Sequence, residues 1–272
     1  MTTLLLSAID RFLEAARVVS RTDVLRPIEH RIEVIMRRHW RLQRQAFLIV
    51  FRAYSNLFRE ATSEDFQDAF VASEGRTSAE AARRLQIEME AAARAGMTAL
   101  MVDVGIEIGF DVHHPLAVSW MENYGARRIA GIDETTRSYI RTVVRDGIDQ
   151  GWNYNKVAEM ISERYEEFRV GRPQAHIASR AHMVAVTEAG EAYCSGEAVM
   201  VKDLVSKGLE MEKHWLVTGG RICPICQNND GEGWIPAETA FSSGHDHPLA
   251  HPACRCATQY RLKREDRRME AT

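Results

Sequence analysis

Four of the five cysteines of the chain lie in one short stretch, together with a histidine. They form the segments Cys223-Pro-Ile-Cys226 and His251-Pro-Ala-Cys254-Arg-Cys256. Two thiolates three positions apart can bind one ion, and a second Cys/His cluster after a loop can supply the remaining corners of a tetrahedron. The spacing therefore predicts a zinc site. Its predicted ligands are Cys223, Cys226, His251 and Cys254, and Cys256 competes for the fourth corner.

The ligand types favour a structural metal over a catalytic one. A closed site of four protein ligands is structural, whereas an open site can bind and activate water. No HExxH pair accompanies the cysteines, so we predict neither a catalytic residue nor an enzyme. The alternative is a metal-dependent nuclease or hydrolase in which His245, Asp246 and His247 act beside the Cys/His site. Such an enzyme needs an exposed cation at the scissile phosphate, which a Cys-rich site does not offer.

The composition limits the partners and the compartment of the chain. Its 272 residues, 45% of them apolar, suffice for one large domain or two modest ones. A net charge of -3 argues against a general nucleic-acid coat. The first ten residues lack the basic region of a secretory signal, and no later run approaches a membrane span. We expect a cytosolic product, in which clustered thiols favour a metal over the alternative of two disulfides.

Residues 1–110 are predicted to form helices, because apolar residues recur there every three or four positions among Ala, Leu, Arg and Glu. Hydroxyl groups before acidic residues predict helix starts near Thr62 and near Thr77. Residues 1–59 carry eleven arginines against five acids, and residues 60–107 carry ten acids against four arginines. We favour packed antiparallel helices whose opposite charges neutralise each other. The alternative is a phosphate-binding or portal-binding surface, which would include Arg37, Arg38, Arg41 and Arg44.

Residues 111–208 are predicted to form a helical core. The boundary segment His113-His114-Pro115 precedes three expected helices. They cover Ile132–Ile148, Asn155–Tyr165, and a longer stretch from about Pro173 through Cys194 and possibly to Lys207. Glu188 in the last helix lies beside an alanine-rich surface, which predicts a buried carboxylate with a structural rather than a catalytic role.

Residues 209–272 are predicted to form a small lobe of short strands with a basic-acidic tail. The expected strands are residues 213–217, 233–236 and 257–262, and each is too short to have a core of its own. A metal would replace that core, because its binding free energy becomes folding free energy. The loop Gly244–His247 is expected to face solvent, and residues from Phe241 to His247 look like an insertion between the two half-sites. Cations from Arg261 to Arg268 offer a further alternative, a DNA-binding factor, although nearby acids offset their charge.

Three blocks in this order resemble the phage Mu F-like head morphogenesis proteins, or MuF domain. They are Ile132–Ile148 with the following helix, then Arg180-Ala181 through Thr187-Glu188, and last Trp215 with the two cysteine segments. The last block is the distinctive one, and the resemblance spans about residues 113–262.

The resemblance implies a mainly α protein with a minor capsid role. Such proteins are low-copy components of the phage head that attach near the portal and assist head assembly. We therefore expect the portal and the major capsid protein as partners, and possibly packaged DNA, with no membrane and no small-molecule substrate. The protein would lie in the head interior near the portal, and in the host cytoplasm during assembly. We assign the portal contact to the N-terminal helices.

Overall fold

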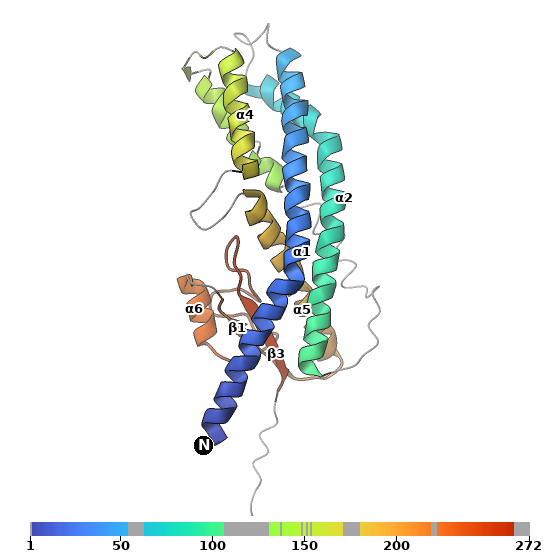
Figure 1. Cartoon of the computed structure of the whole chain (residues 1–272), viewed down its shortest axis with the longest axis vertical. Coiled ribbons are helices and arrows are strands. Elements are labelled where there is room, and N and C mark those ends of the chain that lie inside the picture. The colour runs from blue at the N-terminus through green and yellow to red at the C-terminus, as the bar shows by residue number, and fades with distance from the viewer. Residues whose placement is uncertain are drawn as a thin grey trace, which may run out of the picture. The chain divides into compact units, whose positions relative to one another are not determined.

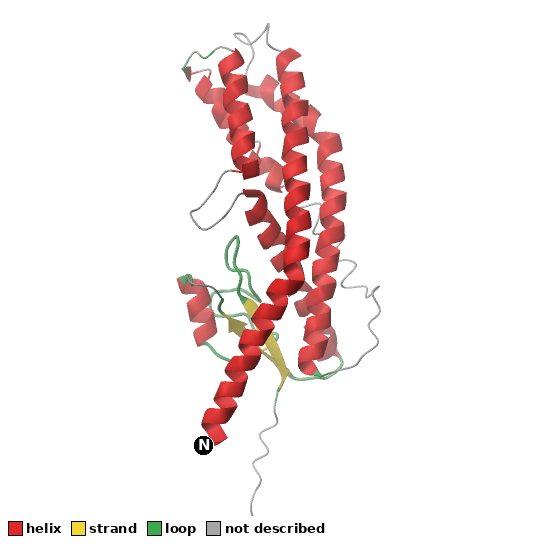
Figure 2. Ribbon diagram, viewed as in Figure 1, coloured by secondary structure: helices red, strands yellow, loops and turns green. Residues whose placement is uncertain are grey.

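The chain is mainly α-helical with one small antiparallel sheet near its C-terminal end, as the sequence predicts (Figures 1 and 2). The computed structural model describes residues 2–53, 63–105, 131–136, 138–147, 149–150, 152, 154–170, 180–218 and 222–263. The elements are α1 (Thr2–Ala53), α2 (Ser63–Val104), helical residues 131–136 and 138–147, α4 (Tyr154–Val170), α5 (Arg180–Ser206), β1 (Met211–Leu216), α6 (Pro224–Gly231), β2 (Ile235–Pro236) and β3 (Ala257–Leu262). None of the described helices combines the length and the apolar run needed to span a bilayer.

The chain divides into two compact units that do not follow sequence order. The bundle unit comprises Ile28–Glu90 and Val118–Val186, and the lobe unit comprises Met1–Pro27, Ala91–Ala117 and Thr187–Thr272. Pro27 lies inside α1, and the division falls directly after it. A proline inside a helix removes one backbone hydrogen bond, which makes this a natural place for such a division. The boundaries at residues 110 and 208 that the sequence suggests stay a prediction.

The bundle unit is built on apolar stripes with helical spacing. Arg31 of α1 pairs with Glu88 of α2 at 2.7 Å, while Gln43 and Ser78 both bind Asp133, so the two helices run antiparallel. The inter-helix ion pair agrees with the favoured interpretation of the opposite charge blocks. Buried apolar side chains of α1, α2, residues 138–147 and α4 form the core: Ile28, Ile32, Met36, Trp40, Phe47, Phe51, Ala81, Leu85, Met89, Ile140, Val143, Val144, Val157, Ile161 and Tyr165.

A buried carboxylate connects three helices of the bundle unit. Asp133 accepts hydrogen bonds from His39 at 2.8 Å, Ser78 at 2.7 Å and Gln43 at 3.1 Å. Burial alone would raise the pKa of this carboxyl, but the bonds and the nearness of His39 outweigh it and hold the pKa below its ordinary value. The expected helix start near Thr77 is wrong, because α2 is continuous from Ser63 to Val104. The Ser78 hydroxyl serves this tertiary contact instead of a helix cap.

In the lobe unit α2 and α5 cross in direct backbone contact. A Cβ added at Gly96 of α2 would lie 2.1 Å from the carbonyl oxygen of Tyr193, and one added at Gly196 of α5 would lie 2.2 Å from that of Ala93. Only glycine permits so close an approach at these two positions. The crossing fixes the part of α5 in which Thr187 and Gly190 face the loop at residues 249–253.

The sheet has the order β2-β1-β3, and both pairings are antiparallel. Met211 pairs with Leu262 at one end of β1 and β3, and Leu216 pairs with Ala257 at the other. All three strands lie within two residues of their predicted positions. The helix α6 was not predicted, since the segment after Cys223 was expected to form turns.

Candidate metal centre

The first cysteine pair is positioned by the start of α6. Cys223 is the N-cap residue of this helix, and its sulfur accepts a hydrogen bond from the backbone N–H of Cys226 at 3.3 Å. Pro224 occupies the first helical turn, where its missing N–H costs nothing. The Cys-Pro-x-Cys sequence therefore folds locally so that both sulfurs lie at the positive end of the helix, which favours the thiolate form that binds metals.

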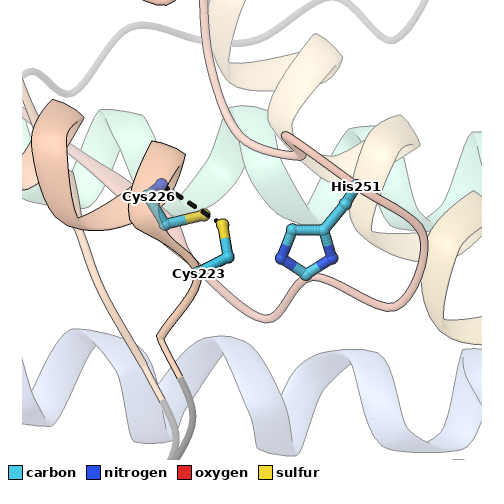
Figure 3. A group of neighbouring side chains, drawn as sticks. All are labelled: Cys223, Cys226 and His251. Atoms are coloured by element: carbon cyan, nitrogen blue, oxygen red, sulfur yellow. Dashed lines mark hydrogen bonds between the residues drawn. The ribbon is translucent and has the colours of Figure 1, made fainter.

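The structure brings together all five predicted ligand residues. They form two groups that share Cys226: one holds Cys223, Cys226 and His251, and the other holds Cys226, Cys254 and Cys256. Within each group the candidate ligand atoms all lie within 4.8 Å of one another. Figure 3 shows the first group, in which the His251 ring lies opposite the two sulfurs. The Nδ1 atom of His251 donates to the carbonyl of Pro252 at 2.9 Å, which leaves Nε2 with the lone pair that a metal requires.

The sulfur spacing fits a shared metal ion and excludes a disulfide. All five cysteines are free, and the sulfurs of Cys226 and Cys254 stand 3.8 Å apart. A disulfide would require about 2.05 Å. Two thiolates at about 2.3 Å from one tetrahedral zinc ion are separated by about 3.8 Å. The cluster can therefore hold a metal ion without rearrangement of this pair.

The pKa values of the buried thiols indicate how a bound cation would change their protonation. The pKa of the Cys254 thiol is raised because it donates a hydrogen bond to Cys256 and is buried, and that same bond lowers the pKa of Cys256. Burial raises the pKa of Cys226 to about 12. Three adjacent sulfurs cannot all be charged in an apolar surrounding, so a cation would displace their protons and bind more weakly as pH falls.

The cysteines also belong to one hydrophobic cluster of the small lobe. Among its five buried residues, three are the cysteines Cys226, Cys254 and Cys256, and the others are Trp215 and Phe241. The two aromatic rings meet edge to face at 5.2 Å between centroids. Phe241 begins the expected insertion between the half-sites, and it is 2% exposed. A metal bound by these cysteines would add its binding free energy to the stability of this cluster.

Side chains of α5 and α1 form hydrogen bonds with the backbone of the second cysteine segment, residues 251–256. Thr187 of α5 accepts a hydrogen bond from the backbone N–H of Ala253 at 2.9 Å. Ala253 has a left-handed backbone with φ of 59°, which is unfavourable for a residue with a Cβ. Arg21 of α1 donates to the carbonyl oxygens of Arg255 and Cys256. The predicted buried position of Glu188 is confirmed, whereas no pattern in the sequence singled out Arg21.

The histidines of the alternative enzymatic site lie outside both groups of described ligand residues. The His245 ring packs against Trp215, with its Nδ1 atom 3.0 Å from the Ser243 hydroxyl. The His247 ring donates to the carbonyl of Pro248 at 2.5 Å, and the carbonyl of Asp246 accepts from Lys213. The structure therefore does not bring these side chains together with the cysteines. His113 and His114 lie outside the described residues.

Residues 138–259 match the family model described as Phage Mu protein F like protein. The matched segment contains α4, α5, the first two strands and all five candidate ligands. No curated protein and no solved structure matches the chain. The family match confirms the resemblance drawn from the sequence, and it covers the elements that position the candidate metal centre. Over residues 138–259, a little under half of its length, the chain is thus similar to the phage Mu F-like head morphogenesis proteins.

Proposed function

We propose that this head morphogenesis protein is a minor capsid component that acts near the portal, and that a structural zinc ion holds its C-terminal lobe together. The family match over residues 138–259 supports the head role. The cysteine cluster, with two of its sulfurs 3.8 Å apart, is the observation that carries the zinc proposal. A role in the virion fits a site that is rich in thiolates, the ligands typical of structural zinc.

Metal content tests the zinc proposal directly. Elemental analysis of the native protein should find about one zinc per chain, the stoichiometry of a closed four-ligand site. Cys226→Ser should lose it, because Cys226 belongs to both ligand groups. Cys194→Ala is the matched control, since Cys194 is buried in α5 and belongs to neither group. A native protein without metal, or a Cys226→Ser variant with full metal content, would contradict the proposal.

The fourth ligand can be identified by comparing two variants. Cys226 and Cys254 take part in every ligand set that we propose, and Cys223 joins them through the α6 start. The fourth corner belongs to His251, as the sequence favours, or to Cys256. The variants to compare are His251→Ala and Cys256→Ser, each substituted with cobalt. The one that removes the true ligand should change the visible absorption. The other variant should leave the band positions unchanged.

We assign the portal contact to one exposed stripe of α1 in the bundle unit. The stripe consists of residues spaced three or four positions apart, so they share one helix face. Its cations Arg38 and Arg41 have no ion-pair partner among the described residues, and Ile49 is 73% exposed. Mixed arginine and aliphatic character suits an acidic protein surface with apolar pockets better than a phosphate backbone. The stripe is Val34, Arg38, Arg41, Gln45, Ile49 and Arg52.

Charge reversal on this stripe tests the portal assignment more cleanly than truncation, which would remove half of the bundle core. In a complementation assay, the double variant Arg38→Glu, Arg41→Glu should reduce the number of copies in purified heads. Arg145→Glu is the control, because Arg145 is exposed on a different helix. Equal incorporation of both variants would refute the assignment.

The structure lowers support for a DNA-binding tail. Two of its five cations are engaged elsewhere: Arg261 pairs with Glu212 at 2.7 Å and stacks on Trp234 at 3.9 Å, and Lys263 pairs with Glu210 at 2.7 Å. Arg264, Arg267 and Arg268 lie outside the described residues. A contact with packaged DNA therefore stays a prediction, and the proposed role does not depend on it.

A further inference from the structure

The C-terminal cysteine segment is held by a residue from the opposite end of the sequence. Arg21 of α1 lies 235 positions before Cys256, yet its guanidinium donates to the carbonyl oxygen of Cys256 and, at 3.3 Å, to that of Arg255. A third bond reaches the carbonyl of Gly190 in α5 at 3.5 Å. One side chain thus joins α1, α5 and the segment that carries two candidate ligands.

Arg21 is buried and packed against its partners, rather than lying at the surface. Arg21 is 5% exposed, and its guanidinium lies over the Tyr193 ring at 5.4 Å. The fully buried Glu197 lies near enough to supply opposite charge. A side chain at position 190 would come within 3.1 Å of the guanidinium, so Gly190 leaves the space that Arg21 occupies. Burying an arginine is costly unless its charge and donors find partners, and here the two terminal nitrogens of the guanidinium donate to backbone carbonyls.

Thr187 supports the same segment from the other side. Its hydroxyl accepts the N–H of Ala253, the left-handed residue directly before Cys254. Arg21 and Thr187 therefore bracket Cys254 and Cys256, one on each side along the chain. Partners that orient metal ligands in this manner typically change metal affinity by about 10- to 100-fold when removed.

We propose that Arg21 is a positioning residue of the metal centre, and that metal binding and the docking of residues 2–27 of α1 onto the lobe are thermodynamically coupled. The inference rests on the proposed zinc site. If docking of α1 strengthens metal binding by some factor, then metal binding must strengthen docking by the same factor. The metal would thereby control whether the N-terminal helical segment is held against the lobe.

Metal affinity is the first test. In a competition titration of Zn²⁺ against a chromophoric chelator, Arg21→Ala should bind about 10- to 100-fold more weakly than the native protein. Arg21→Lys keeps the charge but not the forked pair of donors, and it should recover part of the loss. Arg26→Ala is the matched control, because Arg26 lies on the same helix with a side chain 72% exposed. Thr187→Val should weaken binding while Thr187→Ser retains it, which provides a second route if Arg21→Ala does not fold.

Hydrogen exchange tests the reciprocal effect on the native protein. Removing zinc with a chelator should reduce the protection of amides in residues 2–27 and leave residues 28–53 of the same helix protected. Unchanged protection in residues 2–27, or equal loss along all of α1, would overturn the coupling. If the native protein contains no metal, the zinc proposal itself fails. If it binds one zinc and Arg21→Ala binds it with native affinity, only the positioning role fails.

Discussion

The crossing of α2 and α5 predicts that a substitution which ordinarily stabilises helices will here do the opposite. Gly96→Ala places a methyl group 2.1 Å from the carbonyl oxygen of Tyr193. A carbon and a carbonyl oxygen normally approach to about 3.3 Å, so the two helices would have to separate by about 1 Å. Because both sides of the contact are helix backbone, no side-chain rotation can relieve it.

Two opposing effects set the expected magnitude. Alanine is more favourable than glycine inside a helix by about 1 kcal/mol. Overpacking in a well-packed interior costs about 1–3 kcal/mol, and a gap of about 1 Å along the rest of the crossing forfeits up to about half of the dispersion energy there. The steric effect is the larger, so we expect Gly96→Ala to lower the free energy of unfolding by about 1–2 kcal/mol.

Denaturant unfolding followed by circular dichroism measures this change. The matched control is Gly75→Ala in the same helix, where an added methyl group meets nothing within 4 Å. That control should raise the midpoint, since only the gain of about 1 kcal/mol in helix propensity applies. A Gly96→Ala protein as stable as the Gly75→Ala protein would refute the close crossing of the two helices.

Three further predictions concern other parts of the molecule. Asp133→Asn should destabilise the bundle unit by about 2 kcal/mol or more at neutral pH, because three donors lose a charged acceptor. Since the folded-state pKa of Asp133 is lowered, its contribution is complete above the unfolded pKa of about 3.9 and is lost as pH falls further, so unfolding curves of the two proteins should converge in acid. Gly147→Ala should destabilise because its methyl group would lie 2.6 Å from a Val157 methyl, and Val157→Ala in the same chain should relieve the conflict in thermal unfolding. Burial raises the pKa of Cys194 to about 12, so mass spectrometry after alkylation of the chelated native protein should find Cys194 unmodified while the half-buried Cys223 reacts.

Helices, strands and clusters that depend on residues close together in the sequence can be predicted from it. The hydroxyl and acids at Ser63 mark the start of α2, and the β-prone residues 257–262 form β3. The cysteine spacing predicted a cluster that the fold does assemble, because each half of the cluster is positioned by its own short segment. The Ile28, Ile32 and Met36 stripe likewise lies in the core, since helical periodicity reports burial directly.

Other features depend on partners that are remote in sequence, and no local pattern could reveal them. Ser78 resembles a helix cap, and its use as a donor to Asp133 becomes visible only when three helices meet. Ile87 follows the apolar pattern of α2 but is 54% exposed. The α6 helix was recognisable in principle, from a cysteine N-cap followed by proline, but the Cys-Pro-x-Cys pattern was interpreted as a turn.

The separation between Arg21 and its carbonyl partners has a consequence for synthesis on the ribosome. A chain grows by about 5–20 residues per second, so about 10–50 s pass between the emergence of Arg21 and that of Cys256. During that interval the carbonyl partners of Arg21 at residues 255 and 256 do not yet exist, so this contact of α1 cannot form. The cysteine segment can therefore dock onto α1 only after translation has reached the last cysteine, which makes this contact a late event for each new copy of the protein.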